Sequence, residues 1–98
     1  MSFEKLVYLK HDLQMTTTAN DAYLNILLNK AEAMVKAEGI TAPTDVDEIK
    51  YNMAIVDYAA YLFRKRASAD TTMPFFLRRE LNNLKIQQEA DGGDTNAG

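Results

Sequence analysis

Residues 45–67, with the sequence DVDEIKYNMAIVDYAAYLFRKRA, form the stretch that decides the fold. The apolar positions recur at alternating intervals of three and four residues, the period of an α-helix: Val46, Ile49, Met53, Val56, Ala60, Phe63 and Ala67. Ile55, Ala59 and Leu62 form a second stripe beside the first, so the apolar face is wide. Such a helix needs cover on more than one side. We therefore predict an all-α, single-domain bundle of four helices around a long central third helix.

Both ends of this helix match its dipole. Thr44 is the expected N-cap, and Asp45, Asp47 and Glu48 follow it in the first turn, where negative charge is favoured. The other end carries three consecutive cations, Arg64, Lys65 and Arg66. We therefore assign the acidic residues to capping and not to acid–base catalysis.

The flanking segments predict the other three helices. The first is expected over residues 3–13, before a run of threonines, and the second over residues 20–38. Gly39 follows the second helix, as is typical of a left-handed C′ position. Pro74 suits the first turn of the fourth helix, which is expected to end near residue 89.

Composition bounds the class of protein. A chain of 98 residues with 47% hydrophobic and 26% charged residues suits one globular domain, which we place at residues 1–90. Residues 91–98 contain no apolar side chain larger than alanine and are expected to be a disordered tail. There is no cysteine for disulfides, no apolar run near the ~18 residues of a membrane span, and no signal-peptide pattern. We expect a protein that folds in the cytoplasm and has no membrane partner.

The sequence offers little for catalysis. His11 is the only histidine, and its neighbour Asp12 would project about 100° away from it around a helix, so the two do not converge. No phosphate-binding loop, nucleophile elbow or metal-ligand spacing occurs. We therefore expect no enzyme, with no catalytic residue, no cofactor and no metal.

A group of cations is the strongest polar feature: Arg64, Lys65, Arg66, Arg78 and Arg79. Three interpretations remain open, namely a solvated cluster, ion pairs with a neighbouring copy, and contact with nucleic-acid phosphates. The net charge of −3 argues against a protein that coats nucleic acid. Because Arg78 and Arg79 lie early in their helix, where the dipole disfavours cations, we expect at least one to pair with another subunit's acid or with phosphate. Reversing both charges is expected to block assembly without unfolding the monomer.

Three tyrosines on the central helix are candidate interface residues: Tyr51, Tyr58 and Tyr61. Tyrosine combines apolar area with a polar handle and is enriched at protein interfaces. The alternative is that they lie at the edge of the core with their hydroxyl groups in water.

The order of these features resembles the small helical head–tail connector (adaptor) proteins of long-tailed bacteriophages, over about residues 3–89. The matching residues are these, in chain order: Leu6-Val7-Tyr8-Leu9-Lys10 to Leu13, Asn20-Asp21, Pro43, Tyr61-Leu62-Phe63-Arg64, and Met73-Pro74 with Leu77, Leu81 and Leu84. The resemblance implies a structural protein of the virion, located at the head–tail junction after assembly in the bacterial host cytoplasm.

The partners that the resemblance implies are copies of the chain itself, in a dodecameric ring, and two other virion proteins. The ring would bind beneath the portal protein, extend the DNA channel, and dock the next head-completion (stopper) or tail protein. The alternative class is a small helical DNA-binding or regulatory module. It would use the basic junction between the third and fourth helices, although a connection of about six residues is long for a helix-turn-helix.

Overall fold

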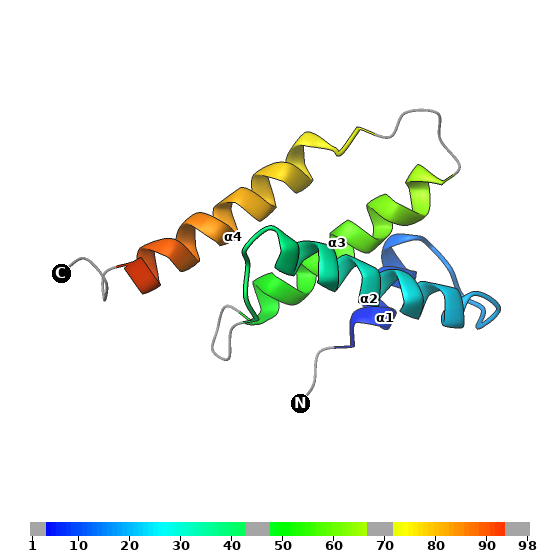
Figure 1. Cartoon of the computed structure of the whole chain (residues 1–98). Coiled ribbons are helices and arrows are strands. Elements are labelled where there is room, and N and C mark those ends of the chain that lie inside the picture. Colours follow the sequence, from blue (N-terminus) through cyan, green and yellow to red (C-terminus); the bar gives the residue numbers. More distant parts are fainter. Residues whose placement is uncertain (1–3, 43–47, 67–71, 94–98) are drawn as a thin grey trace.

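Helix α3 (Glu48–Lys65) runs through the middle of the computed structural model, and the other helices pack around it (Figure 1). They are α1 (Lys5–Asp12), α2 (Asp21–Ala37) and α4 (Phe75–Gly93), and each of the three contacts α3. The structure describes residues 4–42, 48–66 and 72–93. The predicted all-α domain with a central third helix is therefore confirmed.

Small and branched side chains of α3 form the centre of the core. Ala54, Ala59 and Ala60 are buried, and their size lets neighbouring helices approach closely, while Ile55 and Val56 fill the space between them. The surrounding helices and the link after α2 supply further buried apolar residues, which are Leu9, Leu24, Leu27, Leu28, Ala31, Val35, Ile40, Leu77, Leu81 and Leu84.

Left-handed residues end the first two helices. The N–H groups of Gln14 and Met15 donate to the carbonyls of His11 and Lys10, with Gln14 at a φ of 59°, the pattern of a Schellman motif. Gly39 has a φ of 95° after α2, as its sequence position predicts. The break after α1 thus comes from its C-terminal geometry as well as from the threonines that follow.

The helix boundaries differ from the predictions mainly in α4. This helix continues to Gly93, so residues 91–93 are helical and do not belong to a disordered tail. Extending a helix adds a backbone hydrogen bond per residue and needs no apolar side chain, which is why the apolar pattern missed this turn. The predicted cap at Thr44, and residues 94–98 of the predicted tail, lie outside the described residues.

The molecule is flat. Its extents are 52 × 35 × 18 Å, and its smallest dimension is less than the combined diameter of two packed helices, about 20 Å. Helix α4 lies along one edge, antiparallel to α3, and projects past the beginning of α3 (Figure 1). A helix at the edge of so thin a molecule buries one side and exposes the others.

Candidate functional site

Helix α4 packs on the domain by a single apolar stripe. Leu77 and Leu81, with Leu84 one turn further on, point into the core and are at most 5% exposed. Its other large apolar side chains face solvent: Phe75 is 78% exposed, Phe76 60% and Ile86 62%. Exposed apolar residues are common singly, and three on one helix make its outer side a candidate interaction surface.

Helices α3 and α4 enclose an open groove of about 480 Å³. Apolar side chains come from both helices, and the polar ones include one cation from each. The lining residues are Ile49, Lys50, Met53, Phe76, Arg79, Glu80, Asn83, Leu84 and Gln87. A groove between two helices with an apolar lining suits the apolar face of a third helix.

A pair of carboxyl groups joins the two walls at one end of the groove. Asp57 on α3 and Glu80 on α4 are half-buried and hydrogen-bonded to each other. Burial raises the pKa of Glu80 to about 8, and its hydrogen bond with Asp57 and that residue's charge act in the same direction. Burial also raises the pKa of Asp57, with the nearby Asp12 adding to it. The pair therefore holds a proton near neutral pH.

The carboxyl pair lies between two hollows of the surface. Glu80 lines the groove, whereas Asp57 lines a second, smaller hollow with Arg64 and Lys65. Phe76 lines both hollows. Two carboxyls that share a proton can act as an acid–base dyad. Here they lie between two open surface hollows, and within the described residues no group of three or more His, Asp or Glu could hold a metal. The pair places a negative charge beside the apolar side chains of the groove.

Two polar contacts fix α4 to the link that follows α2. The Arg78 guanidinium donates to both oxygens of Glu38, at 3.0 and 2.9 Å, and lowers the pKa of that carboxyl. Further along α4, the Gln88 side chain accepts from the Thr41 backbone N–H at 2.9 Å and donates to its carbonyl at 2.6 Å. Helix α4 is thus held at two points ten residues apart.

The structure spreads the predicted basic cluster over several surfaces. Arg64 reaches α1 and lies 3.3 Å from an Asp12 carboxylate oxygen. The Lys65 ammonium lies 5.8 Å from the centre of the Tyr61 ring. The Arg66 guanidinium stacks 4.9 Å from the Tyr23 ring and 5.5 Å from the Phe63 ring.

The two arginines of α4 behave differently. Arg78 pairs with Glu38 in its own chain, so reversing Arg78 and Arg79 together would also remove a contact within the monomer. Arg79 is exposed and lines the α3–α4 groove, so it is the one of the two arginines to which the predicted pairing with an external acid or phosphate still applies.

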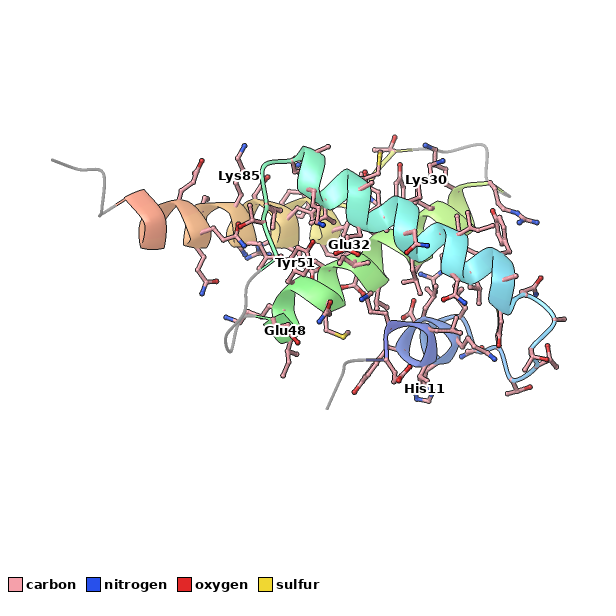
Figure 2. All side chains as sticks on the ribbon, turned by 60° about the horizontal axis from the view of Figure 1, so that its bottom comes forward. His11, Lys30, Glu32, Glu48, Tyr51 and Lys85 are labelled. Atoms are coloured by element: carbon pink, nitrogen blue, oxygen red, sulfur yellow. The ribbon has the colours of Figure 1, made fainter. Side chains whose placement is uncertain are left out.

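Two of the three predicted interface tyrosines belong to the core. Tyr51 is 2% exposed and its hydroxyl donates to Glu32 at 3.1 Å, between α3 and α2 (Figure 2). Tyr58 is 4% exposed and packs edge-on against Tyr61. Their burial contradicts an interface role in the folded chain. Tyr61 is half-buried and lines the smaller hollow, so it remains a candidate.

Helix α1 presents a second exposed face. Val7 is 59% exposed and Tyr8 47%, and both line a hollow of about 560 Å³ with Lys10, His11, Met15 and Thr16. His11 points away from the rest of the molecule (Figure 2). Glu4, directly before the helix, is also exposed.

Three features of the site were not predicted from the sequence, namely the Asp57–Glu80 pair, the groove, and the Glu38 contact. The sequence did contain a signal for one of them, the Asp57–Glu80 pair. Asp57 lies four residues after Met53 and four before Tyr61, so an acid interrupts a stripe of large side chains at helical spacing.

No family model, curated protein or solved structure matches the chain. In the part of the chain that the structure describes, no helix is long and apolar enough to cross a membrane.

Proposed function

We propose that this protein is a structural ring subunit of a bacteriophage virion, a head–tail connector that binds beneath the portal and docks the next protein of the junction. The observation that carries the proposal is the exposed apolar surface of α4, with Phe75, Phe76 and Ile86 on a helix that buries only one stripe. The resemblance of the sequence to connector proteins supplies the identity of the assembly.

Other features support an assembly role. The chain is thin and its exposed apolar residues lie on helices, which leaves extended surfaces for neighbours on two sides. In a ring each subunit uses two different surfaces, and the α1 face and the α3–α4 groove are two such surfaces.

The alternative DNA-binding function receives less support. Arg64 and Arg78 pair with acids of the same chain, and Arg66 stacks on two rings. A phosphate-binding surface needs cations that converge on one track.

Native mass spectrometry over a wide concentration range, followed by electron microscopy, tests the proposal. A discrete species of about twelve copies with a central opening is the expected result. The double variant Phe75→Asp, Ile86→Asp should reduce this species and leave the monomer folded, because both side chains are exposed. Ile26→Asp is the matched control, since Ile26 is 62% exposed on α2. A stable dimer that binds duplex DNA with steep salt dependence would support the DNA-binding module instead.

A further inference from the structure

We infer that the exposed face of α1 in one copy of this chain docks into the α3–α4 groove of the next copy, parallel to α3. The occupant is therefore a second copy, joined head to tail. This inference deepens the proposed function by naming the two surfaces that meet, and it rests on that function only for the closure of the contacts into a ring.

The α1 face has the pattern of a docking helix. Glu4, Val7, Tyr8 and His11 follow one another at intervals of three, one and three residues, so they share one side of the helix. All four are exposed. The face thus has two apolar side chains in its centre, an acid before them and an imidazole after them.

The groove has the complementary order of charges along α3. Lys50 lies at the end where α3 begins, and Met53 follows one turn later. Glu80 lines the groove from α4, and its partner Asp57 lies one turn beyond Met53 on α3, where it lines the adjoining smaller hollow. Lys50 and Asp57 are seven residues apart, as are Glu4 and His11. At 1.5 Å per residue, both pairs span about 10 Å along a helix axis.

Charge complementarity determines whether α1 docks parallel or antiparallel to α3. With α1 parallel to α3, Glu4 lies beside Lys50, and the His11 imidazole donates a hydrogen bond to the Asp57–Glu80 pair. The reverse direction would bring Glu4 onto the carboxyl pair, where like charges repel. Val7 and Tyr8 meet Met53 and the apolar lining in either direction.

The two surfaces also match in shape. Phe76 is 60% exposed beside the carboxyl pair and projects from the groove wall. The hollow of about 560 Å³ on the α1 face is lined by Val7, Tyr8, His11 and Met15 among others. In the parallel arrangement this hollow lies over Phe76, so each surface contributes an apolar projection and an apolar recess.

Disulfide trapping in the full chain tests the contact directly, since the chain has no cysteine of its own. Two single-cysteine variants, Val7→Cys and Met53→Cys, are mixed and oxidised. Because docking holds the two thiols at a high effective concentration, we expect mixed disulfides to form about tenfold faster than in the control mixture. The control pairs Met53→Cys with Ile26→Cys, a residue as exposed as Val7.

Charge reversal tests the direction. Introducing Glu4→Lys into the Val7→Cys chain, or Lys50→Glu into the Met53→Cys chain, should slow trapping, and combining the two reversed chains should restore it. Lys30→Glu, at an exposed lysine of α2, is the control that should leave trapping unchanged. A lack of rescue would overturn the parallel arrangement.

The remaining outcomes are also decisive. Equal trapping with Val7→Cys and Ile26→Cys, or faster linking of Met53→Cys with itself, would overturn the inference. Rings of about twelve copies that form without the Val7–Met53 link would overturn it and leave the proposed function standing. Specific linking that gives open chains without closed rings would support the contact and refute the connector function.

Discussion

At the level of single residues, the Asp57–Glu80 pair makes the stability of the fold depend on pH. Folding raises the pKa of Glu80 from an ordinary value of 4.5 to about 8, so between these values the folded chain holds more protons than the unfolded chain. The free energy of unfolding therefore falls as the pH rises through this window, and the full loss is reached above the folded pKa. Asp57 shifts in the same direction and adds to the loss.

Glu80→Gln should remove the part of this dependence that comes from Glu80, because the amide does not titrate and donates a hydrogen bond to the Asp57 carboxylate. We expect the variant to exceed the natural chain by about 1 kcal/mol in the free energy of unfolding at pH 9, a modest value because the pair is only half-buried. Urea unfolding at pH 5, 7 and 9 measures it. Glu89→Gln, an exposed position of the same helix, is the control. An unchanged pH slope in Glu80→Gln would show that the pair holds no proton.

Charge reversals at the neighbouring residues Arg78 and Arg79 should differ in their effect on the stability of the monomer. Arg78→Glu places a negative charge against Glu38 and should lower the free energy of unfolding by about 1 kcal/mol, the size expected for a partly exposed bidentate pair. Arg79→Glu should change it by less than about 0.5 kcal/mol, because the side chain is exposed. Thermal or urea unfolding compares the two variants. Equal destabilisation would mean that Arg79 also supports the monomer.

At the level of elements, one stripe of buried leucines (Leu77, Leu81 and Leu84) holds α4 against the rest of the domain. Leu81→Ala should lower the free energy of unfolding by about 2–4 kcal/mol, because the side chain is 1% exposed and its loss leaves a cavity. Ile86→Ala, on the same helix but 62% exposed, should cost less than about 0.5 kcal/mol. Chemical denaturation of both variants measures the difference. Similar costs would show that the outer side of α4 is covered in solution.

The helices themselves could be predicted because their signals are local. Gly39 ended α2 as its position indicated, and the apolar period of residues 45–67 gave the central helix. The last turn of α4 could not be predicted from apolar spacing, since residues 91–93 carry none. The end of α1 depends on Gln14 in a left-handed conformation, which is uncommon for that residue type.

The site was harder to predict because its contacts join distant parts of the chain. Whether a tyrosine of α3 lies in the core or on the surface depends on which neighbour covers it, and α2 covers Tyr51. The Asp57–Glu80 and Glu38–Arg78 contacts depend on how α4 lies against α3 and the end of α2. Helical periodicity places residues on a face but does not say which helix the face meets.

At the level of the whole molecule, the flat shape explains why so many apolar residues remain exposed. A molecule whose smallest extent is 18 Å has little interior, so the helices around α3 leave part of their surface exposed. The exposed residues are spread over all four helices, and the groups that lie beside hollows are those of α1 and of the α3–α4 groove. The two surfaces proposed to meet are therefore distinct, as a closed ring requires.

The order of the helices in the chain has a consequence for the timing of synthesis. Helix α1 emerges from the ribosome first, whereas the groove has no second wall until α4, the last of the four, has been made and has packed on α3. During synthesis, the exposed face of α1 is therefore available before the α3–α4 groove has formed. In the proposed head-to-tail contact, only a chain whose fourth helix is complete can bind a neighbour on both sides, so the formation of α4 would control when a new subunit extends the assembly.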